Sequence, residues 1–150
     1  MPAVLKPQLL TGVGIAVTGG ATHVEARLSE LGATPGHGVL VHQADPPQDA
    51  GGVRAALDGA WDAIRTHALP PREALIVLIA PPPGDPHHEA ARAGIENLAR
   101  TLSIEWARHG IRPVAILPGG GTTPAELAEL VAFLASRAGA YYAGCAFSLR

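Results

Sequence analysis

The run ALIVLIA at Ala74–Ala80 constrains the fold most strongly, because an uninterrupted apolar stretch of this length indicates a strand that is buried on both faces. A strand of this kind lies inside a parallel sheet, with helices above and below it. Other short apolar runs alternate with helical patterns, and they lie at 13–18, 38–43, 112–117 and 141–149. The alternation predicts an α/β fold with three layers: a parallel sheet of about five strands and helices on both of its faces.

The predicted helices lie between these strands. THVEARLSELG has helical spacing and ends at Gly32. Segment 50–67 carries one apolar face, with Val53, Leu57, Trp61 and Ile64, and segment 88–109 carries another, with Ala91, Ile95, Leu98, Leu102 and Trp106. Thr123-Pro124-Ala125-Glu126 is a capping box with proline at the first helical position, and it predicts a helix that continues to Gly139.

Composition limits the class of protein. A chain of 150 residues suits one domain, 1–150, and a net charge of -2 without a basic run argues against nucleic acid or an anionic membrane as partner. The single cysteine, Cys145, excludes an internal disulfide and fits a reducing compartment. No apolar run is long enough to cross a bilayer, and the N-terminus lacks the pattern of a signal peptide. We therefore expect a cytoplasmic protein.

The second half of the chain resembles a known family. The stretch from Glu89 to Leu149, with EAARAGIENLARTLS, then GIR, a strand, PG and a helix containing FLAS, is similar to the C-terminal half of the short-chain dehydrogenases/reductases. LLTGVGIAVTGG resembles the first strand of that family and its Thr-Gly turn. The resemblance implies a Rossmann-like sheet, NAD(P) as cofactor and an oxidoreductase ancestry, but a fold alone does not imply activity.

The nucleotide-binding motifs depart from the family pattern. Thr18, Gly19 and Gly20 stand where the resemblance places the phosphate turn, but no glycine follows before Gly32, and Glu25 would repel a phosphate. A tight turn that needs glycine for its backbone shape is the alternative. The segment GATPGHG before Val39 is too short for a strand, a helix and another strand, so we expect the second and third strands of the family to be missing. HQAD, with Ala44, stands where the family often has NNAG.

The catalytic positions are also changed. The resemblance places His88 at the family's Tyr and Arg92 at its Lys, while Ala80 or Pro81 stands at the Ser that holds the substrate oxygen. A histidine can act as general acid or base near neutral pH, and an arginine can bind a ribose or phosphate. The alternative is that His87 and His88 form a solvated pair at a helix start. In the family, the loop after the strand that corresponds to 112–117 contacts the cofactor, so the resemblance implies cofactor contacts for Pro118, Gly119 and Thr122. A flexible loop is the alternative.

Other polar residues offer weaker candidates. His37, His42 and Asp45 lack the close spacing of a metal site, so no metal is expected. Ser103 has no paired base and lies mid-helix, and Cys145 is expected to be a small buried side chain in the last strand. A small ligand in the crevice at the carboxyl ends of the strands, near Ala80, Pro118 and Thr122, is a further alternative.

Two functions remain open from the sequence. The departures favour a shortened, non-catalytic or atypical relative of the family, which acts through binding or assembly. The other function is an active NAD(P)H-dependent reductase or dehydrogenase of a small carbonyl or alcohol, with His88 and Arg92 as its catalytic pair. In the family, the helices that correspond to 50–67 and 88–109 form subunit contacts, so we expect a homo-oligomer or association with a full-length relative.

Overall fold

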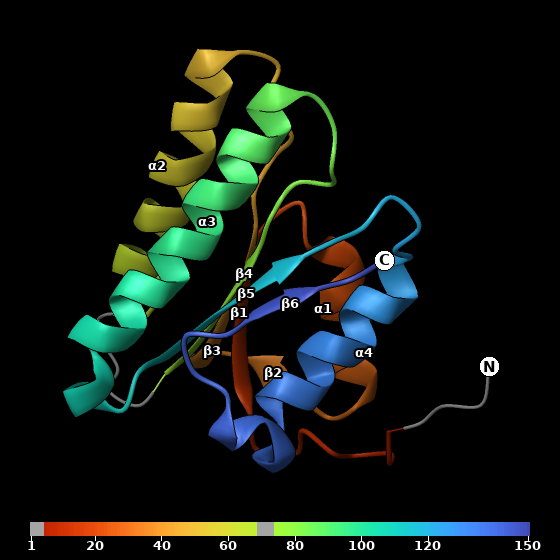
Figure 1. Ribbon diagram of the computed structural model, residues 1–150. Helices are drawn as coiled ribbons and strands as arrows, with labels where there is room; N and C mark the ends of the chain where they lie inside the picture. The colour runs from red at the N-terminus through yellow and green to blue at the C-terminus, as the bar shows by residue number, and fades with distance from the viewer. Residues whose placement is uncertain (1–4, 69–73) are drawn as a thin grey trace.

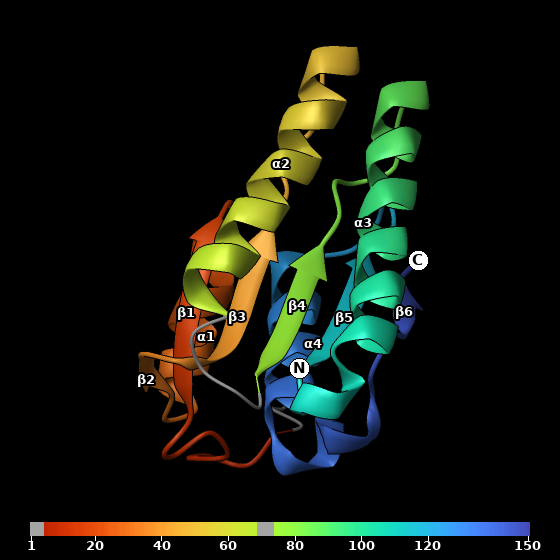
Figure 2. The ribbon, with the colours of Figure 1, turned by 90° about the vertical axis from the view of Figure 1, so that its left-hand side faces the viewer.

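A six-stranded parallel sheet forms the centre of the computed structural model, which describes residues 5–68 and 74–150 (Figures 1 and 2). Every strand pair is parallel, and the strand order is β2-β1-β3-β4-β5-β6. The strands are β1 (Gly14–Gly19), β2 (Thr34–Pro35), β3 (Gly38–Gln43), β4 (Leu75–Ile79), β5 (Arg112–Leu117) and β6 (Ala146–Ser148). All five residues of β4 are buried, as the apolar run predicts.

Helices cover both faces of the sheet, which confirms the predicted three-layer α/β architecture. Helices α2 (Ala50–His67) and α3 (Pro86–Glu105) lie side by side on one face, and α1 (Thr22–Glu30) and α4 (Pro124–Ala135) lie on the other (Figure 2). Short 3-10 turns follow α3 at Ala107–His109 and α4 at Arg137–Tyr141. In the described part of the chain, no helix is both long and apolar enough to cross a membrane.

The strand count differs slightly from the expectation of about five. The additional strand is β2, which contains only two residues and pairs with Gly14 and Ile15 at the edge of the sheet. The segment before Val39 therefore contains a short edge contact instead of the strand, helix and strand of the full family fold. Because β2 contains only two residues, the C-terminal part of β1 extends past its pairing with β2.

The face of α2 that packs on the sheet matches the predicted one fully only at Ile64. Its buried residues are small or aliphatic, namely Ala56, Ala60, Ala63 and Ile64. Trp61 is 37% exposed, and it stacks on Trp106 with ring centroids 6.1 Å apart. Alanines allow the helix axis to come close to the sheet. Val53 and Leu57 are therefore only partly buried against this core.

The helix boundaries also refine the predictions. Helix α3 begins at Pro86, because the Asp85 side chain accepts hydrogen bonds from the backbone of the first turn, and it ends at Glu105. The capping box of α4 is present as predicted, with Thr123 and Glu126 bonded to each other's backbone. However, α4 ends at Ala135, short of Gly139, and the last strand covers only three residues of the predicted 141–149.

Candidate functional site

The carboxyl ends of the parallel strands meet at one edge of the sheet, and the candidate residues lie there. The chain leaves β1 toward β2 on one side and returns to β3 on the other side, so the strand order reverses between β1 and β3. Ligands of open α/β sheets bind in the crevice at such a point. Thr18, Gly19 and Gly20 lie at the end of β1, and Ala44 lies just after β3.

The turn after β1 packs directly against the end of β3. Gly19 has φ +67°, and a side chain there would collide with the carbonyl of Gln43. The Gly20 N–H donates to the same carbonyl at 3.3 Å. Glycine adopts this conformation without strain. Gly19 and Gly20 therefore allow the backbone of the turn after β1 to lie close to the backbone at the end of β3.

The surroundings of this turn do not match the needs of a diphosphate. Helix α1 starts after Ala21, which has no side-chain cap, and Glu25 places a carboxylate in its first turn. A phosphate would be repelled by that carboxylate, although the helix start itself favours anions. Ala44 is 2% exposed, and its N–H donates to Ile79 across the sheet, so its backbone is already used by the fold. The residues present do not fit a dinucleotide held in the family manner.

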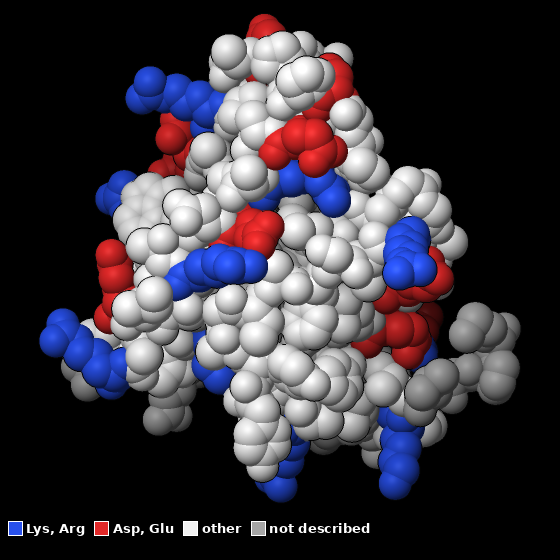
Figure 3. Space-filling view, viewed as in Figure 1, with Lys and Arg blue, Asp and Glu red and all other residues white. Residues whose placement is uncertain are grey.

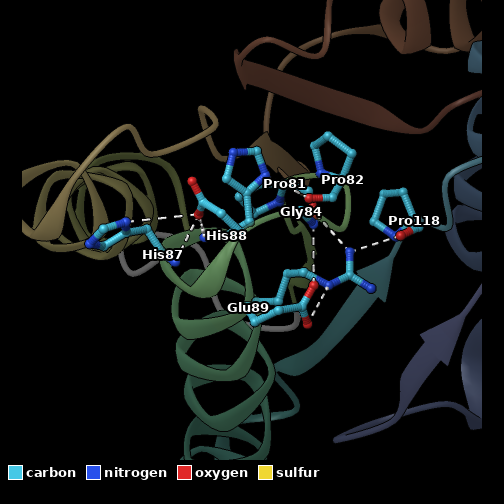
Figure 4. Close-up of polar contacts among 9 residues, drawn as sticks. Pro81, Pro82, Gly84, His87, His88, Glu89 and Pro118 are labelled. Carbon is cyan, nitrogen blue, oxygen red and sulfur yellow. Dashed lines mark hydrogen bonds and ion pairs between the residues drawn. The ribbon is translucent and has the colours of Figure 1, made fainter.

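His88 lies at the start of α3, and its ring is bonded to the preceding loop (Figure 4). Its Nδ1 lies 2.9 Å from the carbonyl oxygen of Pro82, and the ring packs where a side chain on Gly84 would have to be. Asp85 accepts hydrogen bonds from the backbone N–H of His88 and His87. The bond from His88 is the main cause that lowers the pKa of Asp85 below its usual value.

Arg92 connects the loops that follow β4 and β5. Its Nη1 donates to the carbonyl oxygens of Pro81 at 2.7 Å and Pro118 at 2.8 Å, and its side chain is only 14% exposed. Its Nε lies 3.6 Å from Glu89 Oε2, while Glu89 Oε1 accepts a hydrogen bond from the Gly84 N–H at 3.4 Å. Dashed lines in Figure 4 mark the bond between Gly84 and Glu89 and the bond that the Pro118 carbonyl accepts from Arg92.

The loop after β5 is closed by its own contacts. Thr122 Oγ1 accepts a hydrogen bond from the Gly119 N–H at 2.8 Å and lies 3.5 Å from the Arg150 carbonyl oxygen. Gly119 packs against the backbone of Leu149 and Arg150 so closely that any side chain would clash. Ala80 is fully buried, so the strand end that holds a hydroxyl in the resembled family presents none here.

The structure brings together two groups of the predicted residues. His88, Arg92 and Pro118 meet at the ends of β4 and β5, through the carbonyls of Pro81 and Pro82. Thr18 lies beside β3, and its Oγ1 lies 2.9 Å from Nδ1 of His42. The Thr18–His42 contact was not predicted, because no local pattern relates residues on two different strands. Glu89 was also missed, although its position three residues before Arg92 is the spacing of a helical ion pair.

The remaining candidates are placed as follows. Within residues 5–68 and 74–150, no three His, Cys, Asp or Glu side chains form a metal-binding group. Ser103 Oγ donates to the Arg100 carbonyl of its own helix at 2.7 Å. Cys145 is half-buried in the segment just before β6, so the expectation of a buried strand residue was wrong. The Cys145 carbonyl accepts a hydrogen bond from the Ala115 N–H at 3.0 Å, but Gly144 has φ +68°, which is not a strand conformation, and β6 begins at Ala146.

Comparison with known proteins supports the resemblance of the sequence. No family model matches the chain. A probable 2,4-dienoyl-CoA reductase of Bacillus subtilis (strain 168) is 36% identical over an alignment of 87 residues, and the match covers 39% of this chain and 34% of that protein. The match thus takes in about a third of the relative's length.

Solved structures match nearly the whole chain. A citronellol catabolism dehydrogenase from Pseudomonas aeruginosa PAO1 is 20% identical, with a TM-score of 0.71, over 99% of this chain and 98% of that chain. An enoyl-[acyl-carrier-protein] reductase (NADH) from Aquifex aeolicus VF5 is 17% identical, with a TM-score of 0.76, over 93% and 95% of the two chains. The predicted resemblance is confirmed: this chain has the fold of the short-chain dehydrogenases/reductases.

Proposed function

We propose that this protein is a reduced relative of the short-chain dehydrogenases that acts through binding or assembly and not through catalysis. The observation that carries the proposal is the use of Arg92. Its guanidinium is bound to two backbone carbonyls, of Pro81 and Pro118, and is largely buried. Both N–H donors of Nη1 are used in this way, so this nitrogen does not serve a ribose or a proton donor.

The other positions support the same proposal. His88 is bonded to the Pro82 carbonyl, and the strand end beside it carries Ala80 and Pro81, which have no hydroxyl. The turn after β1 uses the Gly20 N–H within the fold, and only two residues of β2 stand where the resembled family has its adenosine wall. We therefore propose that NAD(P) is not bound in the family manner.

A cofactor titration tests this proposal. Purified protein is titrated with NADH and, separately, with NADPH to about 1 mM by calorimetry, and the melting temperature is measured at each concentration. We expect no saturable heat and no rise in melting temperature, because a ligand stabilises a fold only when it binds the native state. A saturable signal with either cofactor, lost in Arg92→Met but kept in Arg54→Met, would contradict the proposal. Arg54 is an exposed control on α2.

We further propose that the outer side of α2 and α3 is the assembly surface. Trp61 is 37% exposed on α2, and Ile104 is 80% exposed on α3. Exposed large apolar side chains on adjacent helices indicate a contact with another protein chain. Basic and acidic side chains are interspersed on the face shown in Figure 3, where the outer side of α2 and α3 is seen at its left edge.

Sedimentation velocity tests the assembly. We expect a dimer or larger species at micromolar concentration, and we expect Ile104→Glu to shift it to the monomer. Tyr141→Glu is the matched control, because Tyr141 is 93% exposed but lies outside α2 and α3. A wild-type monomer, or equal effects of both variants, would argue against this surface.

A second candidate is an NAD(P)H-dependent reductase of a small carbonyl or alcohol that uses His88 and Arg92. One observation favours it: His88 and Arg92, which the resemblance places at the family's Tyr and Lys, both contact the loop that follows β4. The test is NADPH oxidation with a panel of small aldehydes and ketones. Activity that disappears in His88→Ala and persists in His87→Ala would support this candidate over the first. Figure 4 shows that His87 points away from Pro118, so it is a suitable control.

A further inference from the structure

Thr18 and His42 lie directly opposite each other on the neighbouring strands β1 and β3. Thr18 Oγ1 lies 2.9 Å from His42 Nδ1, which is a hydrogen-bond distance. A hydroxyl within this distance of an imidazole nitrogen has the arrangement of a nucleophile and its general base. Both residues lie near the carboxyl ends of their strands, where open α/β sheets bind their ligands.

His42 has the properties of a general base for this hydroxyl. It is only 8% exposed, and burial lowers its pKa below the usual value of a histidine, although Asp45 acts in the opposite direction. The neutral ring is therefore favoured. In the tautomer that carries its proton on Nε2, the other nitrogen, Nδ1, accepts a hydrogen bond from the Thr18 hydroxyl. This ring can take the hydroxyl proton when Thr18 attacks a carbonyl carbon.

The face of β1 that carries Thr18 is partly open to solvent. Side chains alternate along a strand, so Thr18 points to the same face as Ala16, which packs against the core beneath α2 and α3. Ala16 and Thr18 are both half-buried, whereas Leu40, the partner of Ala16 on β3, is 1% exposed. The helices on this face therefore cover β3 fully and leave the Thr18 side of β1 accessible to a small molecule.

A pocket of about 240 Å³ adjoins the pair on the side of His42. Besides His42, its walls include small residues of α2, namely Gly52, Ala55, Ala56 and Gly59. Pockets for drug-sized ligands measure roughly 300–1,000 Å³, so this smaller one leaves room for a compact ester beside the pair. The lining includes neither His88 nor Arg92, so this place is separate from the candidate site at β4 and β5.

We propose that Thr18 is a covalent acylation site, which takes an acyl group from a small activated ester with His42 as general base. A bond forms between Thr18 Oγ1 and the carbonyl carbon of the ester, and the bond from that carbon to the leaving oxygen breaks. The Thr18 proton passes through His42 to the leaving oxygen, so atoms and charges balance. The ester formed on Thr18 has no activated leaving group, so the acyl group stays and no turnover follows. The proposal does not depend on the proposed function.

Labelling with p-nitrophenyl acetate tests the proposal. The purified protein is incubated with this ester near neutral pH, nitrophenolate release is followed by absorbance, and the acetylated residue is located by mass spectrometry of peptides. We expect a burst of nitrophenolate and an acetyl group on Thr18. The sequence contains one lysine, Lys6, and one cysteine, Cys145, so labelling of these stronger nucleophiles is easily distinguished. Acetylation of Lys6 or Cys145 without Thr18, or no acetylation, would overturn the proposal.

Variants separate the base from the hydroxyl. His42→Gln keeps a polar side chain without a base, and we expect it to slow the acetylation of Thr18 about 100-fold. Thr18→Ser should keep the reaction, and Thr18→Val should lose it.

Thr101, an exposed hydroxyl of α3, is the internal control and should stay unlabelled. Equal rates at Thr18 in the wild type and in His42→Gln, or equal labelling of Thr18 and Thr101, would contradict the proposal. Circular dichroism establishes the folding of each variant, and if a variant does not fold, the position of the label in the wild type decides the outcome.

Discussion

Arg92 Nη1 lies 2.8 Å from the carbonyl oxygen of Pro118, and this bond joins α3 to the end of β5. The same nitrogen donates to the Pro81 carbonyl at the end of β4. A charged donor that serves two carbonyls in a largely buried place stabilises the loops around it, because carbonyls that lose their partner would be poorly hydrated. Arg92, which the resemblance places at the family's lysine, thus has a structural use in this chain.

The first prediction concerns the stability that Arg92 provides. Arg92→Met removes both hydrogen bonds, and we expect the free energy of unfolding to fall by about 2–4 kcal/mol in urea titrations. Arg54→Met should change it by less than about 0.5 kcal/mol, because Arg54 is exposed and makes only a surface ion pair. Equal stability of the two variants would show that the Arg92 bonds contribute nothing.

The second prediction concerns the backbone of the turn after β1. Gly19→Ala forces a side chain into a left-handed conformation and against the Gln43 carbonyl, so we expect a loss of about 2 kcal/mol or more. Gly20→Ala is the control, because a methyl group there has ordinary contacts with the Gln43 side chain at 3.7 Å. Thermal and urea unfolding of both variants provide the measurement. A tolerated Gly19→Ala would refute the backbone role of Gly19.

The third prediction concerns pH. Burial lowers the pKa of His42 in the folded protein below the usual value of a histidine, about 6.5. Near and below pH 6.5 the unfolded chain therefore binds more protons than the folded protein, so stability falls as the pH decreases toward the folded pKa. We expect the melting temperature, measured by calorimetry, to fall less between pH 7.5 and pH 5 in His42→Gln than in the wild type. The difference between the two proteins should correspond to about one titrating group. Parallel pH curves would contradict this assignment.

The fourth prediction concerns the cap of α4. Thr123 Oγ1 accepts a hydrogen bond from the Glu126 N–H at 3.3 Å, and Glu126 Oε2 accepts one from the Thr123 N–H at 2.8 Å. Thr123→Ala should therefore cost about 1 kcal/mol of unfolding free energy. Thr101→Ala, at an exposed position within α3, should be neutral or slightly stabilising. If Thr101→Ala proves as costly as Thr123→Ala, the capping account fails.

Local patterns determined the elements of this fold. The buried run Leu75–Ile79, the start of α4 at Pro124 and the bounds of α2 all follow from residues close together in the chain. The alternation of strands and helices predicted a parallel sheet, because two neighbouring parallel strands must be joined by a crossover connection, which is usually a helix. The shortness of the segment before Val39 also revealed that strands of the full fold are missing, because chain length limits what a segment can form.

Only the tertiary structure decided how the candidate residues are used. The family resemblance predicted His88 and Arg92 as a catalytic pair, but their observed partners, the carbonyls of Pro82, Pro81 and Pro118, depend on how two loops meet. The face of α2 on the sheet was likewise set by close packing of alanines, which a count of large apolar residues does not reveal. Periodicity reports neighbours along one element, whereas hydrogen bonds between separate strands and loops depend on the folded arrangement of the whole chain.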